Sequence, residues 1–254
     1  NSSAPHPDYL SLDSRKISSP GKTIFFAIKN KHQDANLFIE ALYKKGVRNF
    51  ITDDKNSHSS HLLLANIILV NNTVSAFQKL AIFHRDQFLK NNLPVIGITG
   101  SNGKTVVKEW LYQLLENEFS IVRSPKSFNS QIGVPLSVLN IRPTNNLAIF
   151  EAGISLPGEM KNLEKIIKPT IGIFTNIGNA HDEGFKNRKE KINEKLILLK
   201  KAKYQISCAD KKELGKEIKL YKDKNNQYQL YTWGRNTNNT IQIQRIKKNL
   251  STSF

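Results

Sequence analysis

The chain has 254 residues, of which 39% are hydrophobic and 23% are charged, a composition typical of a globular protein with one large domain or two smaller ones. No apolar run is long enough to span a bilayer, and the start lacks a basic segment followed by an apolar core, so we expect a cytoplasmic protein without a membrane span. The single cysteine, Cys208, excludes an internal disulfide and a cysteine-cluster metal site. We expect it to be a buried thiol at the end of a strand.

The charge balance is strongly basic, with 38 Lys and Arg residues against 21 Asp and Glu and a formal net charge of +17. Such a balance indicates an anionic partner, for example a phosphorylated ligand, a membrane surface or a nucleic acid. The lysines are spread over many predicted helices, and their denser stretches at 186–203 and 211–224 lack the interleaved aromatic residues of a stacking platform. We therefore interpret most of this charge as solvated surface and expect no nucleic-acid partner.

Residues 1–92 are predicted to form a small α/β domain. Short apolar runs predict strands at 23–28, 49–52 and 66–70. Helical spacing predicts one helix over 35–45 that stops at Gly46, and a second that Thr73 caps and that continues to about residue 88. The polar pair Asn91-Asn92 ahead of Pro94 interrupts both periodicities and marks the expected domain boundary.

Residues 93–254 alternate between strand and helix patterns. The predicted strands are 95–99, 147–151, 171–175, 204–208 and 228–232, and the predicted helices are 105–117, 158–168, 187–203 and 210–221. This alternation predicts an α/β domain with a mainly parallel sheet covered by helices. In such folds ligands bind at the carboxyl ends of the strands.

The segment Gly97-Ile-Thr-Gly-Ser-Asn-Gly-Lys-Thr105 connects a buried strand to a helix through a glycine loop. Backbone N–H groups of such a loop and the following helix N-terminus bind phosphate, Lys104 would neutralise the outer phosphates, and the Thr105 hydroxyl would ligate magnesium. The spacing departs from G-x-x-x-x-G-K-[ST] because Ile98 takes the place of the first glycine. The alternative is a plain turn with a solvated lysine. The predicted nucleotide-binding residues of the loop are Gly100, Ser101, Asn102, Gly103, Lys104 and Thr105.

Three further polar residues lie near predicted strand ends or on a neighbouring helix. Glu151 ends an apolar run, and its carboxylate is expected to be a magnesium ligand, with capping of the next turn as the alternative. His181 follows the strand at 171–175, and the residues alone leave a structural and a functional role equally open. Lys195 borders the apolar stripe of its helix, whereas most other lysines of that helix point elsewhere. The residues alone favour the interpretation that its stem packs on the stripe and its ammonium reaches solvent.

The phosphate loop resembles that of the Mur ligases, the family that builds the peptide stem of bacterial cell-wall precursors with ATP. Matching segments run nearly end to end, at 13–15, 20–21, 24–27, 46–48, 97–105, 128–135, 151–153, 158–160 and 175–185. Within the family, Ile132-Gly-Val-Pro135 and His181-x-Glu-Gly-Phe185 most resemble the ligase that joins D-alanyl-D-alanine to UDP-N-acetylmuramoyl-tripeptide. The chain departs from the common pattern at Asp34-Ala-Asn36, where Asp-Gly-His is frequent, and at Ser155-Leu156, which replaces Asn-His.

The resemblance implies ligands for both parts of the chain. Residues 1–92 would bind the uridine diphosphate end of the substrate, and residues 93–254 would bind ATP and Mg²⁺. The implied substrate-binding residues are Ser14, Arg15, Asn129 and Gln131, and Asn176 joins the nucleotide-binding set.

The resemblance also implies catalytic and metal-binding roles. Thr105 and Glu151 would hold one magnesium ion and His181 a second, while Lys195 would take up carbon dioxide and bind metal as a carbamate, which reverses the snorkelling interpretation. Lys104, His181 and Lys195 form the implied catalytic set.

The implied reaction is ATP-dependent ligation through an acyl phosphate by a monomeric enzyme. Mur ligases have a third, carboxy-terminal domain that residues 1–254 do not supply, and some resemble the front half of fusions with alanine racemase. The alternatives are another Mur-type or folylpolyglutamate-type ligase, or a non-catalytic module that binds nucleotides or nucleic acid.

Overall fold

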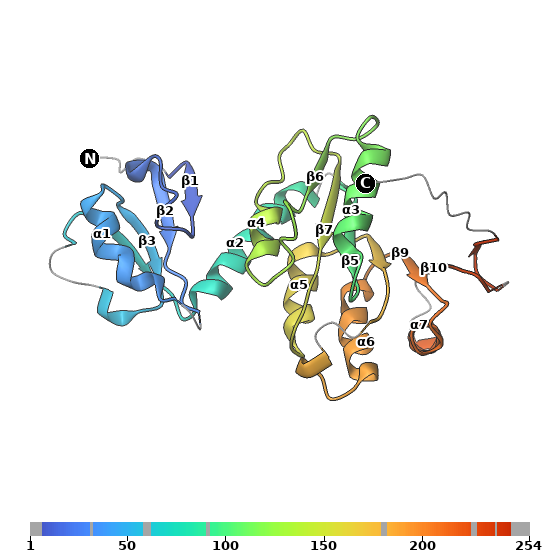
Figure 1. The fold of residues 1–254 in the computed structure, drawn as a ribbon. Coiled ribbons are helices and arrows are strands. Elements are labelled where there is room, and N and C mark those ends of the chain that lie inside the picture. Colours follow the sequence, from blue (N-terminus) through green and yellow to red (C-terminus); the bar gives the residue numbers. More distant parts are fainter. Residues whose placement is uncertain are drawn as a thin grey trace, which may run out of the picture. The chain divides into compact units, whose positions relative to one another are not determined.

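The computed structural model describes residues 7–30, 33–57, 62–89, 92–178, 182–224, 228–236 and 238–244. The chain divides into two compact units, Asn1–Leu80 and Ala81–Phe254, which are described separately here (Figure 1). The division lies inside helix α2 (Thr73–Leu89). The ligand-binding roles expected for residues 1–92 and 93–254 stay predictions.

The first unit contains a parallel sheet in the order β1-β2-β3-β4. Phe25 and Phe50 of neighbouring strands are fully buried and meet edge to face, with ring centroids 6.5 Å apart. Phe77 of α2 packs in the same manner on Phe26 at 5.3 Å. The elements are β1 (Tyr9–Ser11), β2 (Thr23–Phe26), η2 (Ala35–Phe38), α1 (Ile39–Lys44), β3 (Asn49–Thr52) and β4 (Asn66–Leu69), with short 3-10 turns η1 (Pro20–Lys22) and η3 (Lys55–Ser57).

The start of α2 differs from the prediction. Asn72, and not Thr73, caps the helix, because the Asn72 Oδ1 accepts a hydrogen bond from the Ser75 backbone N–H at 2.8 Å. Thr73 is already the first helical residue, and its own N–H is donated to the Asp53 carboxylate at 3.1 Å.

The second unit is built on a parallel sheet in the order β11-β10-β9-β8-β5-β7-β6. Its strands are β5 (Val95–Thr99), β6 (Ile121–Arg123), β7 (Leu147–Glu151), β8 (Ile171–Phe174), β9 (Tyr204–Cys208), β10 (Gln229–Gly234) and β11 (Ile241–Gln242). Strands β5 and β7 are buried at every position, which agrees with their continuous apolar sequence.

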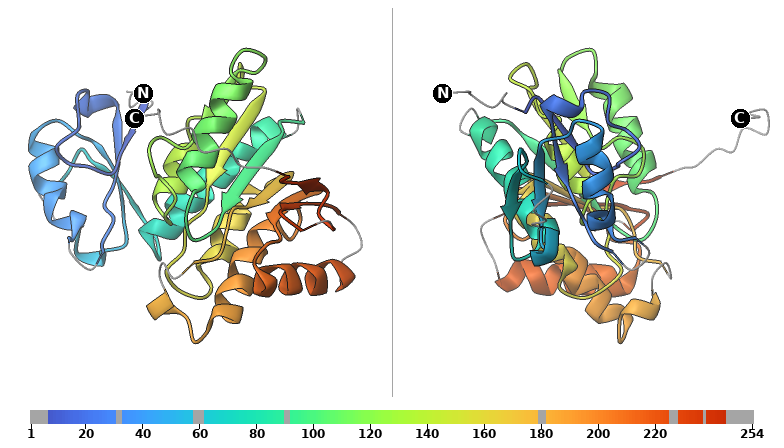
Figure 2. Two further views of the ribbon diagram at one scale, coloured as in Figure 1. Left: turned by 45° about the vertical axis from the view of Figure 1, so that its right-hand side comes forward. Right: turned by 90° about the vertical axis from the view of Figure 1, so that its left-hand side faces the viewer.

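Helices pack on both faces of this sheet (Figures 1 and 2). Buried side chains of α4 (Gly133–Val138), α5 (Glu159–Ile167), α6 (Arg188–Leu196), α7 (Lys212–Lys224) and the second part of α2 form the core on one face. The other face carries α3 (Lys104–Leu115), which packs on the apolar side chains of β5, β7 and β8. The α/β fold with a parallel sheet and helices is thus confirmed.

Strands β1 and β6 and helix α4 were not predicted, and one helix is shorter than expected. Strands β1 and β6 and helix α4 have three to six residues, too few to show a period in the sequence. The helix predicted over 187–203 is α6 alone, followed by the 3-10 turns η5 (Ile197–Leu199). Cys208 is buried at the end of β9, as predicted.

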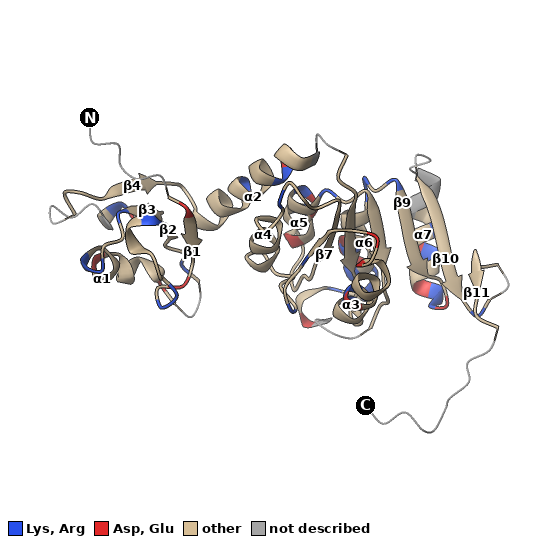
Figure 3. Ribbon diagram, turned by 90° about the horizontal axis from the view of Figure 1, so that it is seen from above, with Lys and Arg blue, Asp and Glu red and all other residues tan. Residues whose placement is uncertain are grey.

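Basic residues are distributed over elements of both units (Figure 3). Among the described residues, no helix combines the length and apolar character needed to cross a membrane.

Removal of a buried leucine side chain should destabilise the second unit. Leu163 of α5 is fully buried, and Leu163→Ala is expected to lower the free energy of unfolding by about 2–5 kcal/mol through lost burial and a new cavity. Leu114→Ala is the matched control, because Leu114 of α3 is 75% exposed and should change stability by less than about 0.5 kcal/mol. Urea unfolding followed by the fluorescence of Trp110 and Trp233 measures both, and equal losses would contradict this packing.

Candidate active site

The carboxyl ends of three neighbouring strands meet at one edge of the larger sheet. Strand β5 lies between β7 and β8, with Ile98 paired to Glu151 on one side and Thr99 to Phe174 on the other. The glycine loop, Glu151 and the segment after β8 therefore lie together, as expected for a ligand site in a parallel α/β fold.

The glycine loop follows β5 and depends on its two glycines. Gly100 has φ of 142°, and a Cβ atom there would lie 2.1 Å from the Thr175 Oγ1, so a larger residue does not fit. Gly103 has φ of 80° and stands immediately before the first residue of α3. The loop therefore passes tightly from a buried strand into a helix, as the sequence predicted.

Asn176 holds this loop from the end of β8. Its backbone oxygen accepts the Ser101 N–H at 2.9 Å, and its side-chain oxygen accepts the Asn102 N–H at 3.2 Å. The Thr175 hydroxyl also donates to the Asn102 oxygen at 2.6 Å. Because two loop N–H groups are thus engaged, the donors best placed for phosphate are those of the first turn of α3, which have no intrahelical acceptor. Asn176 positions the loop in this structure.

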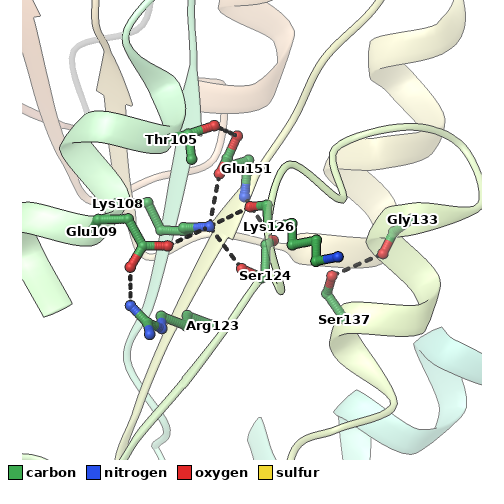
Figure 4. A network of polar contacts seen from close by, with 9 residues as sticks. All are labelled: Thr105, Lys108, Glu109, Arg123, Ser124, Lys126, Gly133, Ser137 and Glu151. Carbon is green, nitrogen blue, oxygen red and sulfur yellow. Dashed lines mark hydrogen bonds and ion pairs between the residues drawn. The ribbon is translucent and has the colours of Figure 1, made fainter.

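Glu151 is completely buried and is held by two residues of α3. The Thr105 hydroxyl donates to the Glu151 Oε2 at 3.0 Å, and the Lys108 ammonium forms an ion pair with Oε1 at 3.1 Å (Figure 4). The Glu151 backbone N–H is donated to the Ser124 hydroxyl at 3.2 Å. The carboxylate thus points to the start of the phosphate-loop helix.

Three lysines gather beside the loop. Lys104 and Lys195 both donate to the Gly100 carbonyl oxygen, at 2.9 Å and 3.4 Å, and Lys191 donates to the Gly178 carbonyl oxygen at 2.6 Å. Lys195 is 1% exposed and Lys191 is fully buried. The snorkelling that the helical spacing alone favoured for Lys195 is therefore wrong, and Lys191 is buried beside it. The two lysines lie four residues apart, on one face of α6.

Burial and mutual repulsion alter the proton affinity of this cluster. Burial, followed by the charges of Lys104 and Lys191, lowers the pKa of Lys195 to about 7. Burial also lowers the pKa of Lys104, although the nearby Glu151 carboxylate opposes that shift. About half of the Lys195 side chains are therefore neutral amines at pH 7.

A cavity of about 370 Å³ opens beside Lys104 and Lys195. Two predicted substrate-binding residues, Asn129 and Gln131, line it, so the structure brings them to the phosphate loop. The Gln131 amide donates to the Glu159 backbone oxygen at 3.1 Å, which fixes one wall. The remaining lining residues are Ser130, Ile132, Gly153, Ile154, Ser155 and Glu159.

The other predicted site residues lie elsewhere in the chain. Ser14 and Arg15 follow β1 in the first unit, and the Arg15 guanidinium pairs with Asp13 at 2.9 Å. That hydrogen-bonded pair lowers the pKa of Asp13 to about 2. His181 lies outside the described residues.

Thr105 and Glu151 fit a magnesium ion. Two oxygens at right angles around Mg²⁺, each at 2.0–2.1 Å, are about 3 Å apart, and the Thr105 and Glu151 oxygens are 3.0 Å apart. Both are the hard oxygen ligands that Mg²⁺ prefers. In the described part of the chain no group of three or more His, Cys, Asp or Glu side chains is placed to hold a metal, so further ligands would come from nucleotide, water or a modified lysine.

Sequence reasoning missed Lys108 and Lys191. Lys108 is on the stripe that α3 buries, with Leu111 and Leu115, and is fully buried. The sequence did contain a signal for Lys108. It lies four residues after Lys104, on the apolar stripe of the helix, where a lysine is unusual.

Comparison with known proteins places this geometry in a family. Residues 98–254 match the model of the Mur ligase middle domain, which covers the phosphate loop, Glu151 and Lys195. The chain belongs to the Mur ligase family.

This Mur ligase chain is similar to relatives that are longer. It is 34% identical over 200 residues to the UDP-N-acetylmuramoyl-tripeptide–D-alanyl-D-alanine ligase of Borreliella burgdorferi, covering 76% of this chain and 42% of the relative. A MurF ligase from Thermotoga maritima, solved in complex with ADP, superposes with a TM-score of 0.74 at 30% identity, covering 91% of this chain and 51% of that one. MurF from Acinetobacter baumannii shares the fold, with a TM-score of 0.79 at 24% identity, and the matched regions are 89% of this chain and 48% of that chain. The chain thus spans about half the length of these proteins.

The lowered pKa of Lys195 predicts a pH-dependent stability. The folded state loses this proton near pH 7, whereas the unfolded state keeps it to about pH 10.4, so the unfolded state binds more protons between these values and stability rises with pH across that window. Lys195→Met removes the buried charge. The free energy of unfolding of the variant should therefore exceed that of wild type by the largest amount at pH 6. Above pH 7 this difference in free energy should shrink by at most about 1.4 kcal/mol per pH unit.

Chemical denaturation in buffer free of carbon dioxide measures this difference. Lys161→Met is the control, because Lys161 is an exposed lysine of α5, and its difference from wild type should not change with pH. A constant difference for Lys195→Met would show that Lys195 keeps an ordinary pKa.

Proposed function

We propose that this chain is the ATP-binding and substrate-binding part of a cytoplasmic ligase that joins D-alanyl-D-alanine to UDP-N-acetylmuramoyl-tripeptide. The observation that carries the proposal is the contact of Thr105 with the buried Glu151 at the start of the phosphate-loop helix, beside the cavity lined by Lys104 and Lys195. The name of the Borreliella burgdorferi relative supports the choice of substrates, and the ADP complex of the Thermotoga maritima relative supports the nucleotide.

The phosphate loop would bind the nucleotide phosphates. N–H groups of the first turn of α3 face the site, and the helix N-terminus adds partial positive charge. Lys104, whose ammonium now donates to loop carbonyls, would exchange them for phosphate oxygens. Thr105 and Glu151 would hold Mg²⁺, which supplies charge neutralisation when bound with ATP as the phosphoryl donor.

The cavity beside the loop would hold the peptide carboxylate. The carboxylate takes the γ-phosphoryl group to give an acyl phosphate with release of ADP, and the amine of D-alanyl-D-alanine then displaces inorganic phosphate and loses a proton. Asn129 and Gln131, which line the cavity, would orient the peptide end. Residues 1–92, with Ser14 and Arg15, would bind the uridine diphosphate end.

Lys195 would act as a carbamate. Carbon dioxide reacts with a neutral amine, and burial among cations leaves about half of the Lys195 amine neutral at pH 7, far more than for an exposed lysine. The product is an anion beside Lys104 and Lys191, which converts repulsion into attraction and provides oxygen ligands for a metal ion. His181 is proposed as a second metal ligand. Incorporation of ¹³C-bicarbonate, measured by NMR on wild type and on Lys195→Ala, tests the carbamate.

Nucleotide binding tests the phosphate loop. Calorimetric titration of the chain with ATP and Mg²⁺ should show binding that Lys104→Ala weakens by at least about tenfold, because a charge-assisted contact to phosphate is lost. Lys161→Ala should bind as wild type does, since Lys161 is exposed on α5 away from the cavity lining. Equal affinity of wild type and Lys104→Ala would refute the assigned role of Lys104.

Ligation by the full-length protein tests the substrates. With UDP-N-acetylmuramoyl-tripeptide and ATP, release of phosphate should depend on D-alanyl-D-alanine and be at least about tenfold slower with single amino acids or glutamate, because specificity requires the dipeptide to fill its site. The 254-residue chain alone should bind nucleotide but turn over poorly. Preference for another amine would reassign the protein to a different ligase of the family.

A further inference from the structure

Lys108 of α3 has a fully buried side chain, and its ammonium lies among oxygens from three parts of the chain (Figure 4). The Lys108 Nζ is 3.1 Å from the Glu151 Oε1 and 2.9 Å from the Glu109 Oε1. It also donates to the backbone oxygens of Ser124, at 2.8 Å, and Lys126. Four oxygens thus surround one ammonium that has three protons.

The charges of this cluster depend on one another. Glu151 is a carboxylate with no exposed surface, and an isolated buried charge is strongly unfavourable. Lys108 supplies the nearest positive charge, while Arg123 pairs with the other oxygen of Glu109. Lys108 is therefore shared between the buried carboxylate of Glu151 and the half-buried carboxylate of Glu109, and only Glu109 has Arg123 as a second cation.

The two oxygens of Glu151 have different partners. Oε1 faces Lys108, and Oε2 accepts the hydrogen bond from Thr105. Tilting the carboxylate plane away from this orientation would break both contacts, so Lys108 keeps one Glu151 oxygen directed to the phosphate loop. A metal ion at Thr105 would need this orientation.

Lys108 takes its own position from a segment separate from the phosphate loop. Its backbone acceptors, Ser124 and Lys126, follow β6, and Lys126 has φ of 51°, a left-handed conformation that a residue other than glycine rarely adopts. The same segment continues to Asn129 and Gln131 in the cavity wall. Lys108 thus links the phosphate-loop helix, the end of β7 and the cavity wall.

We propose that Lys108 is a positioning residue that acts through Glu151, holding one carboxylate oxygen so that the other can bind the magnesium ion of the nucleotide. The inference rests on the proposed function, because it assigns the metal to Thr105 and Glu151. Lys108 itself contacts neither nucleotide nor metal in this assignment. It couples metal binding to the packing of α3 against the segment after β6.

The test compares ADP binding with and without Mg²⁺ by calorimetry on the 254-residue chain. Lys108→Met keeps the length of the side chain and removes its charge. We expect ADP affinity without Mg²⁺ to change less than about threefold, whereas the gain in affinity on adding Mg²⁺ falls by about tenfold or more, since contacts to charged groups are lost. An unchanged Mg²⁺ gain in Lys108→Met overturns the proposal.

Glu109→Gln is the matched control. It alters the other carboxylate on Lys108 but no residue assigned to the metal, and the Mg²⁺ gain should stay within about threefold of wild type. Lys108→Arg keeps the charge and hence the fold, but its planar group cannot take the ammonium position among four oxygens, so an intermediate loss is expected. Full retention of the Mg²⁺ gain in Lys108→Arg contradicts a positioning role.

A double-mutant cycle separates positioning from general damage. In a Glu151→Gln background, Lys108→Met should lower the remaining Mg²⁺ gain by less than about threefold, because the residue through which Lys108 acts has already lost its charge. The same large loss in both backgrounds, or an equal loss of Mg²⁺-free binding, means a structural role and overturns the inference. If wild type does not bind ADP at all, the proposed function itself is contradicted. If both wild type and Lys108→Met show normal Mg²⁺-dependent binding, only the role of Lys108 is contradicted.

Discussion

The buried carboxylate of Glu151 is the constraint on which the candidate site depends. It ends the fully buried strand β7, so its charge must be satisfied by groups that the fold brings to it. The partners, Thr105 and Lys108, come from α3, which packs against that strand. The packing of this one helix therefore fixes the phosphate loop, the carboxylate and their mutual distance together.

The lysine cluster makes the candidate site electrostatically favourable for anions. Lys104 and Lys195 share one carbonyl oxygen, and Lys191 lies close enough for its charge to lower the pKa of both. Such a group is unfavourable by itself, and any anion that enters relieves the repulsion. Phosphate groups and a carbamate on Lys195 are both anions of this kind. The two features that the proposed chemistry needs, a carboxylate for the metal and an anion pocket, therefore meet at consecutive residues, because Thr105 contacts Glu151 and Lys104 belongs to the lysine cluster.

Elements with a continuous apolar run and residues within a local sequence motif could be predicted from the sequence. The continuous apolar runs of β5 and β7 indicated buried parallel strands, and the glycines before Lys104 indicated a tight turn into a helix. Strand β6 and helix α4 escaped prediction because three to six residues show no periodicity. The same limit hid Ser124, which follows β6 and contacts both Lys108 and the Glu151 backbone.

The sequence by itself determined the α/β class and the place of the phosphate loop, and it predicted roles for Lys104, Thr105 and Glu151, because these follow from short patterns along the chain. Only the tertiary structure decided which lysines are buried. Snorkelling and burial give the same helical spacing, and whether Lys191 and Lys195 reach solvent depends on what packs over α6. The contacts of Lys108 could not be seen in the sequence either, since its acceptors at 124 and 126 and its ion-pair partner Glu151 are distant in sequence and meet only when the strands pair.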